Sequence, residues 1–302
     1  MTSVQANGIT IEYVETGPRD GHVILLIMGL GMQLVAWPQS FVDGLVARGF
    51  RVVRFDNRDV GHSTPMPSAG SLATSAMMAR AFFGLPVRPS YSLNDMARDA
   101  LGLMDALGIG QAHVVGVSMG GMIAQILAIE HPERVKSLTS IMSTTGDRKL
   151  PGPKARVLRA LLRPRPRDKA VAVRRGMELF RLIAGSGYPP TDAELRAKVE
   201  RAVQRSYRPG AVARQLIAIQ AAPSRVHALR RVRAPTLVLH GSDDPLVPMA
   251  GGEDTAANVP GARLRIVPGM GHFLPELLVP LLVDEIAGHC LEAEDAAQSR
   301  VA

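Results

Sequence analysis

The chain is poor in the features that mark secreted and membrane proteins. It has one cysteine, Cys290, among 302 residues, so it cannot form an intramolecular disulfide. Its first residues, MTSVQANGIT, contain neither the basic region nor the apolar run of a signal peptide. No apolar run reaches the ~18–20 residues that a transmembrane helix needs. These absences predict a cytoplasmic protein without a transmembrane segment.

The sequence also lacks the patterns that bind cofactors, metals or nucleic acids. It contains no phosphate-binding loop, no dinucleotide-binding fingerprint and no Cys/His cluster with the spacing of metal ligands. Aromatic residues hardly interleave with its basic residues, and no nucleic-acid-binding motif is present. We therefore expect no cofactor, no metal and no nucleic-acid partner.

What the chain does contain is an alternation of strands and helices around an apolar core. Hydrophobic residues make up 46% of the sequence, which is enough for a large core. Apolar and alternating runs predict strands at 9–16, 23–28, 51–56, 112–117, 135–142, 235–241 and 262–269. Helical patterns lie at 41–49, 92–109, 118–131, 248–258 and 275–289, and the polar end at 292–302 is expected to fray. This order predicts a mostly parallel sheet with helices on both faces.

The middle of the chain interrupts this alternation. Residues 146–226 show amphipathic helices and prolines but no convincing strand, so we expect a helical cap between the core segments 1–145 and 227–302. Residues 148–233 hold 22 Lys and Arg against 5 Asp and Glu, although the whole chain has a net charge of only +8. This basic segment is either a solvated helical surface or a face that binds an anionic surface weakly.

The stretch HVVGVSMGGMIAQ places Ser118 between glycines, where a predicted strand meets a predicted helix. Glycines weaken both strands and helices, so their crowding at Gly116, Gly120 and Gly121 indicates a requirement for space. A G-x-S-x-G turn at this junction is typical of a nucleophile elbow, which exposes a serine hydroxyl at the carboxyl end of a sheet. The sequence therefore predicts that Ser118 is a nucleophile, as opposed to an ordinary serine in a tight turn.

A serine nucleophile needs a base, and the base needs an orienting acid. His272 follows the last predicted strand in a glycine-rich loop, at the same edge of the sheet as Ser118. Two acids, Asp243 and Asp244, follow the preceding strand, and Asp244 is favoured because Pro245 follows it. The resulting chain order Ser–Asp–His is the one that accompanies this elbow.

An oxyanion formed during acyl transfer needs backbone N–H donors. One is expected from Met119, directly after the serine. The other is expected from the loop IMGLGMQ after the predicted strand at 23–28, where Leu30 lies between Gly29 and Gly31.

With these motifs the chain resembles α/β-hydrolase fold proteins, and among them the aclacinomycin methylesterase-like bacterial carboxylesterases. The matching stretches are MGLG…WP at 28–38, RFDNRDVGHST at 54–64, AHVVGVSMGG at 112–121, PTLVLHGSDDPLVP at 235–248 and VPGMGH at 267–272. The resemblance implies an eight-stranded, mostly parallel sheet with an inserted cap. Two features depart from it: Met28-Gly29 stands where His-Gly is usual, and segment 65–91 is longer.

We therefore expect a serine carboxylesterase acting on small-to-medium, mainly apolar esters. Apolar residues near the elbow, in the 65–91 segment and in the cap predict the pocket, namely Met28, Met32, Trp37, Met122, Phe82, Phe83 and Tyr188. No cation is evident beside Ser118, so uncharged acyl chains are expected. Three related reactions use the same triad: C–C bond hydrolysis, perhydrolysis and acyl transfer. A small-molecule receptor on a hydrolase scaffold is the non-enzymatic alternative.

Overall fold

The computed structural model describes residues 2–67, 76–80, 84–164 and 166–299. Eight strands form one sheet in the order β1-β2-β4-β3-β5-β6-β7-β8. Their bounds are Thr2–Ala6, Ile9–Thr16, Val23–Ile27, Arg51–Phe55, Ala112–Val117, Val135–Ile141, Thr236–Gly241 and Arg263–Val267 for β1 to β8. In the order of the sheet, all neighbouring pairs from β4 through β3 to β8 are parallel. The β1–β2 and β2–β4 pairs are antiparallel. The eight-stranded, mostly parallel sheet expected from the sequence is confirmed.

The edge strand β1 was not among the ranges predicted from the sequence. It forms a hairpin with β2 through Asn7 and Gly8, which both have positive φ (48° and 75°). An Asn-Gly pair with this geometry is the commonest signal of a two-residue hairpin turn. The signal was therefore present in the sequence.

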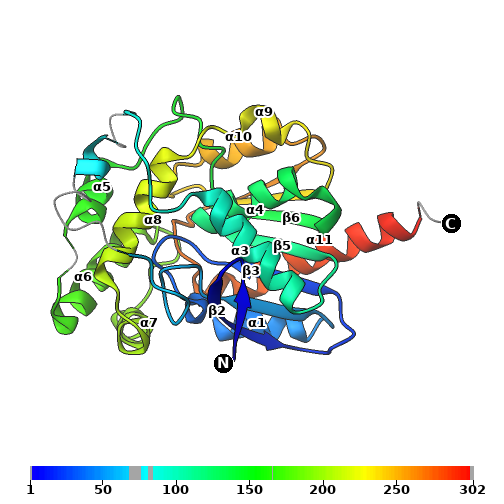
Figure 1. Ribbon diagram of the computed structural model, residues 1–302, viewed down its shortest axis with the longest axis horizontal. Coiled ribbons are helices and arrows are strands. Elements are labelled where there is room, and N and C mark those ends of the chain that lie inside the picture. The colour runs from blue at the N-terminus through cyan, green and yellow to red at the C-terminus, as the bar shows by residue number, and fades with distance from the viewer. Residues whose placement is uncertain (1, 68–75, 81–83, 165, 300–302) are drawn as a thin grey trace.

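Helices cover both faces of the sheet (Figure 1). The helices of the core are α1 (Gln39–Val46), α3 (Leu93–Ala106), α4 (Met119–Glu130), α9 (Val226–Leu229), α10 (Ala250–Asn258) and α11 (Val279–Gln298). One apolar cluster joins α3 and α4 to one face, and a second joins α1 and α11 to the other. All six residues of β5 are buried, as expected for a central strand covered on both faces.

The last helix is longer than the sequence analysis predicted. Fraying was expected from residue 292 on, but α11 continues to Gln298. Its apolar stripe extends through Cys290 and Ala293, which are both buried. The expectation of fraying is therefore wrong over 292–298, because the helix keeps packing against the sheet beyond His289.

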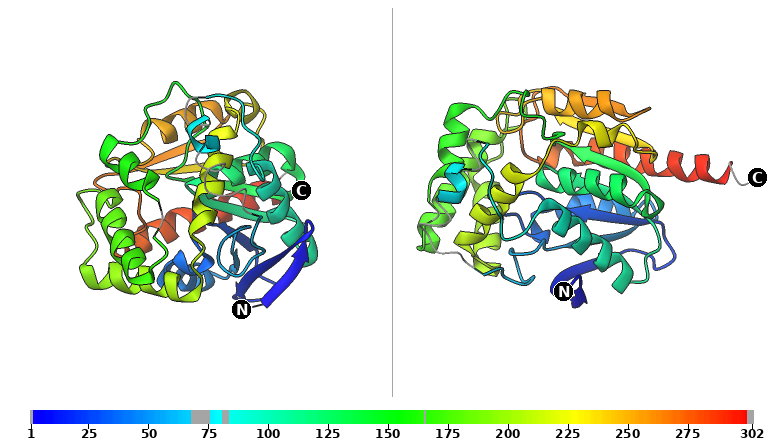
Figure 2. Two further views of the ribbon diagram at one scale, coloured as in Figure 1. Left: turned by 60° about the vertical axis from the view of Figure 1, so that its left-hand side comes forward. Right: turned by 45° about the horizontal axis from the view of Figure 1, so that its top comes forward.

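Four helices between β6 and β7 cover one end of the sheet (Figure 2). They are α5 (Ala155–Leu162), α6 (Lys169–Ile183), α7 (Asp192–Arg205) and α8 (Pro209–Ala221). No strand occurs between 146 and 226 in the described part of this segment. These helices lie over the carboxyl ends of the parallel strands, because one cavity is lined both by them and by the loops after β3, β5 and β8.

Among the described residues, no helix is both long enough and apolar enough to cross a membrane.

Candidate active site

Ser118 lies in the tight turn between β5 and α4, with φ 56° and ψ −118°. This backbone conformation is uncommon for a residue with a side chain. The glycines around it are in close contact with other backbone. A Cβ atom on Gly116 would lie 2.1 Å from the carbonyl oxygen of Gly120, and one on Gly120 would lie 2.0 Å from that of Ile27. The glycines therefore let β5, α4 and the end of β3 approach closely enough to form the turn.

We predict that Gly120→Ala destabilises the protein strongly. The added methyl group must displace the backbone of Ile27, so we expect a loss of about 3 kcal/mol, at the upper end of overpacking costs, in the free energy of unfolding. Gly110→Ala is the matched control, because nothing lies within 4 Å of the Cβ position there and φ is not positive. Urea unfolding measures both variants. Equal stability of the two would show that the elbow does not require a glycine at 120.

Three side chains from different loops form a hydrogen-bonded chain at the carboxyl edge of the sheet. The Oγ of Ser118 lies 2.9 Å from Nε2 of His272. Nδ1 of His272 lies 2.6 Å from Oδ2 of Asp244. His272 and Asp244 are buried, at 8% and 5% exposure. A base within reach of a hydroxyl, oriented in turn by a carboxylate, has the geometry that activates a serine nucleophile.

The two candidate acids have different surroundings. Asp244 is fixed on both oxygens, because its Oδ1 accepts hydrogen bonds from the backbone N–H groups of Leu246 and Val247, each at 2.8 Å. Asp243 points elsewhere and accepts hydrogen bonds from Ser186 and Ser242, which hold its pKa below the usual range. The structure thus brings Asp244, and not Asp243, to His272.

A second histidine, His240, adjoins this carboxylate. Its Nε2 lies 3.6 Å from Oδ2 of Asp244 and 2.8 Å from the carbonyl oxygen of Val247. Burial lowers the pKa of His240 below its usual value. A neutral His240 does not compete with His272 for an ion pair with Asp244.

The loop after β3 lies against the elbow. A Cβ on Gly29 would lie 3.1 Å from Cβ of Ser118 and from the carbonyl oxygen of Val117, so a side chain there would push the loop away from the elbow. The loop is fixed by Asn57, whose Nδ2 donates to the carbonyl oxygen of Met28 at 2.8 Å, and by Gln215 of the cap, which accepts from the N–H of Gly31 at 2.7 Å.

The backbone N–H groups of Leu30 and Met119 have no acceptor among the hydrogen bonds of the described residues. Met119 is completely buried, and an unpaired buried N–H is uncommon. Two free donors flanking Ser118 fit an oxyanion site.

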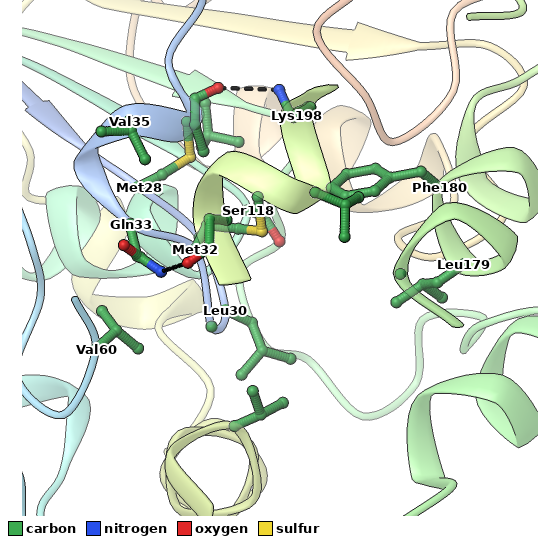
Figure 3. A pocket seen from close by; sticks show the side chains of 18 of the residues that line it. Met28, Leu30, Met32, Gln33, Val35, Val60, Ser118, Leu179, Phe180 and Lys198 are labelled. Atoms are coloured by element: carbon green, nitrogen blue, oxygen red, sulfur yellow. Dashed lines mark hydrogen bonds between the residues drawn. The ribbon is translucent and has the colours of Figure 1, made fainter. Parts of the chain in front are cut away.

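A cavity of about 230 Å³ opens above Ser118 (Figure 3). Met28, Leu30 and Met32 line it from the loop after β3, and Leu179 and Phe180 line it from α6. The lining is mostly apolar, as expected.

Several residues predicted for the pocket lie elsewhere. Trp37 packs against Phe41 in the core between α1 and the sheet, whereas its neighbours Val35 and Ala36 line the cavity. Met122 belongs to the core on the opposite face of the sheet, since the helix turns it away from the elbow. Tyr188 packs beside Gly269 and is not among the lining residues. Phe82 and Phe83 lie outside the described residues.

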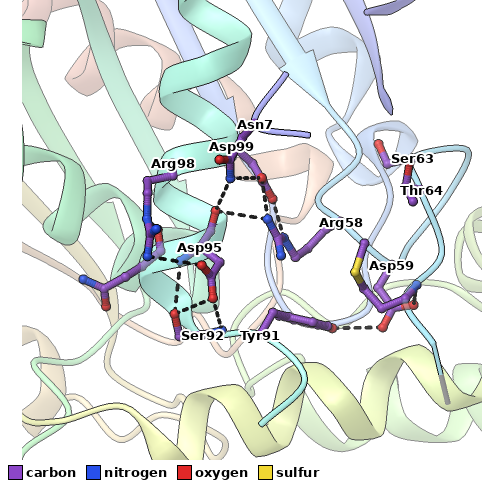
Figure 4. A network of polar contacts seen from close by, with 12 residues as sticks. Asn7, Arg58, Asp59, Ser63, Thr64, Tyr91, Ser92, Asp95, Arg98 and Asp99 are labelled. Atoms are coloured by element: carbon purple, nitrogen blue, oxygen red, sulfur yellow. Dashed lines mark hydrogen bonds and ion pairs between the residues drawn. The ribbon is translucent and has the colours of Figure 1, made fainter. Parts of the chain in front are cut away.

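The turn RFDNRDVGHST connects the core with the cap, a role that the sequence did not indicate beyond its shape. Asp59 accepts two hydrogen bonds from Arg214 of α8, at 2.6 and 2.7 Å. It also accepts one from the hydroxyl of Tyr91 at 3.0 Å (Figure 4). Asp56 forms an ion pair with Arg205 of α7 at 2.8 Å. These pairs are more than 140 residues apart in the chain, so local sequence patterns could not reveal them.

Lys198 of α7 also lines the cavity and was not singled out from the sequence. Among the described residues, no three His, Cys, Asp or Glu side chains are grouped so that they could hold a metal ion.

Comparison with known proteins agrees with this fold. The family model described as "alpha/beta hydrolase fold" matches residues 22–277. Rhodomycin D methylesterase of Streptomyces peucetius is 31% identical over 287 residues, which cover 88% of this chain and 90% of that protein. The 2-hydroxy-6-oxononadienedioate/2-hydroxy-6-oxononatrienedioate hydrolase of Burkholderia vietnamiensis is 28% identical over 272 residues, which cover 88% and 85%. The resemblance to methylesterase-like carboxylesterases is confirmed.

Among solved structures, the meta-cleavage product hydrolase of Pseudomonas fluorescens IP01 superimposes with a TM-score of 0.74. The match covers 97% of this chain and 98% of that one, at 20% sequence identity. At this identity the likeness concerns the fold alone.

Proposed function

This chain belongs to the alpha/beta hydrolase fold family, and we propose that it is a serine carboxylesterase with Ser118, His272 and Asp244 as its catalytic triad. The observation that carries the proposal is the hydrogen-bonded chain from Ser118 through His272 to Asp244 at the floor of the apolar cavity. The similarity to a methylesterase over most of the chain supports ester hydrolysis as the reaction.

The reaction proceeds in two steps. His272 removes the proton from the Ser118 hydroxyl as the oxygen attacks the ester carbonyl, and the N–H groups of Leu30 and Met119 bind the resulting oxyanion. His272 then passes the proton to the departing alcohol, which leaves an acyl group on Ser118. Water, deprotonated by the same histidine, hydrolyses this acyl-enzyme and restores the serine.

The cavity favours esters with apolar bodies. Most of its lining side chains are aliphatic, thioether or aromatic, and each methylene transferred from water into such a site gains about 0.8 kcal/mol. Methionines such as Met28 and Met32 adapt to varied apolar shapes. We therefore propose small-to-medium, mainly apolar esters as substrates.

The experiment that tests this function is an assay of esters, thioesters, lactones, amides and a 2-hydroxy-6-oxodienoate with the purified protein. Ester cleavage well above cleavage of the dienoate supports the esterase. Faster cleavage of the dienoate than of the esters would indicate C–C bond hydrolysis. This reaction is the second candidate because the chain is similar to the hydrolase of Burkholderia vietnamiensis. Preference for an alcohol acceptor would indicate an acyltransferase, and peroxide-dependent oxidation would indicate a perhydrolase. Tight binding without turnover would indicate a receptor.

We also propose that the basic cap binds anionic lipid surfaces. Arg156, Arg159, Arg163 and Arg175 surround a hollow of about 220 Å³, with Glu178 as its one acidic residue. None of these arginines forms an ion pair among the described residues, although Arg175 donates to the carbonyl oxygen of Pro164. Unpaired guanidinium groups on one surface attract phosphate headgroups.

We predict that R156Q/R159Q/R163Q weakens binding to phosphatidylglycerol vesicles roughly hundredfold at low salt. The triple variant R230Q/R231Q/R233Q removes the same charge from exposed positions outside the hollow and is the matched control. Vesicle sedimentation at two salt concentrations measures both. Equal binding by the two triple variants, or no binding by the unmodified protein, would contradict this role.

A further inference from the structure

The charged side chains that line the active-site cavity, among the described residues, are of one sign. Among the described residues that line it, two have cationic side chains, Lys198 and Arg208, and none is Asp or Glu. Arg208 donates a hydrogen bond to the carbonyl oxygen of Ser63 at the base of the cap. An otherwise apolar cavity with cations and no anions favours a ligand that carries negative charge.

Lys198 is held in an environment that is unusual for a lysine. Its Nζ donates to the carbonyl oxygen of Ala36 at 3.0 Å, and it lies 5.0 Å from the ring centre of Phe273 and 5.9 Å from that of Phe180 (Figure 3). Burial lowers the pKa of its ammonium to about 8, against the opposing attraction of Glu276. No carboxylate lies within 4.0 Å of Nζ among the described residues.

Two of the other cap cations that reach the core have carboxylate partners, whereas Arg208 and Arg225 donate to uncharged oxygens. Arg214 pairs with Asp59, and Arg205 pairs with Asp56. Buried charges are usually compensated in this way, because desolvation without a partner is costly. Lys198 is partly exposed in the cavity and has one carbonyl oxygen and two aromatic rings as neighbours, so two of its three N–H donors have no described acceptor. These two donors face a cavity without carboxylates among its described lining residues, so they are available to a partner that arrives with the substrate.

We propose that Lys198 binds an anionic oxygen group, a carboxylate or an ionised phenol, on the apolar body of the substrate and separate from the ester that Ser118 attacks. The inference rests on the proposed esterase function and narrows its substrate class. It also differs from the sequence-based expectation of uncharged acyl chains, which was made because no cation was evident near Ser118. Lys198 lies 80 residues after Ser118 in the chain, and the helix α7 places it in the cavity.

The position of Lys198 also explains how an apolar cavity can select such a substrate. Ala36 and Phe273 belong to the loops after β3 and β8, which also carry Leu30 and His272. A group bound at Lys198 is therefore held relative to the oxyanion donors and the base. Such a contact orients the ester as well as adding affinity.

The test compares monomethyl esters of linear dicarboxylic acids with methyl alkanoates of the same chain length. For at least one length, we expect the unmodified protein to favour the half-ester by roughly ten- to hundredfold in kcat/KM. The variant K198M keeps the unbranched shape but removes the charge, and should abolish the preference. K198R keeps the charge and should retain part of the preference for the half-ester. K169M, an exposed lysine of α6 outside the cavity, is the matched control and should leave the preference unchanged.

Calorimetric titration of the half-esters into the inactive variant S118A, with and without K198M, measures the same contact without turnover. Weaker binding by S118A/K198M, by the same factor as in kinetics, supports the role of Lys198. Equal preference in the unmodified protein and K198M, or equal binding by S118A and S118A/K198M, would overturn it. Failure of the unmodified protein to cleave any ester would refute the proposed function, and the titration would still decide the role of Lys198.

Discussion

Replacing Ser118 with alanine should reduce kcat for ester hydrolysis by about 10⁴- to 10⁶-fold, the range found when a triad nucleophile is removed. The variant should fold normally, because alanine is smaller than serine and Ser118 uses its hydroxyl mainly to meet His272. The backbone contacts of the elbow, including the N–H of Ser118 bonded to the carbonyl oxygen of Ile141, remain possible. Steady-state rates on a methyl ester, with circular dichroism as the folding control, measure the effect.

The same loss is expected for His272→Ala, and the double variant should be little worse than either single one. Nucleophile and base act as a unit, so removing the second costs almost nothing once the first is absent. Activity above a few per cent in Ser118→Ala, or multiplicative losses in the double variant, would show that these residues do not work together.

Asp244→Asn should lower kcat by about 10⁴-fold. The oxygen of the new amide is held by the N–H groups of Leu246 and Val247, which now bond Oδ1 of Asp244. Its NH₂ group then faces Nδ1 of His272 and donates to it. The ring proton moves to Nε2, which faces Ser118 and can no longer accept the serine proton.

Asp243→Asn is the matched control, because it makes the same chemical change one residue away. Asp243 bonds Ser186 and Ser242 and does not contact His272, so a decrease of less than about tenfold is expected. The pH–rate profiles of both variants complete the comparison. If Asp243→Asn were the more damaging change, the orienting acid would have been assigned to the wrong residue.

Much of the fold could be predicted because strands buried on both faces have a simple sequence pattern. The run that became β3 is continuously apolar, those of β5 and β7 are mostly so, and each is followed by a loop rich in glycine or aspartate. The elbow could be predicted because its tight turn requires glycine at positions 116 and 120, and glycine is visible in the sequence. The hairpin of β1 was not predicted, although Asn7-Gly8 is a hairpin-turn signal. The end of α11 was predicted wrongly because most of its residues are polar and only a narrow stripe is buried.

The cavity was harder to predict because it depends on how distant segments pack. Trp37 and Met122 are close to catalytic loops in sequence, but the turn after residues 34–36 and the helix α4 direct their side chains into the core. Lys198 and the ion pair of Asp59 with Arg214 depend on where the cap lies over the sheet, which no local pattern specifies. The cytoplasmic location inferred from the scarcity of cysteine stays a prediction.

The central claim is that hydrolysis passes through an acyl group on Ser118. Rapid mixing with a p-nitrophenyl ester, quenching in acid and mass spectrometry of the peptide that contains residues 113–125 tests it most directly. We expect a burst of p-nitrophenol and an acyl adduct on Ser118, both absent from Ser118→Ala. Turnover of the ester with no adduct at Ser118, or an adduct on another residue, would contradict it.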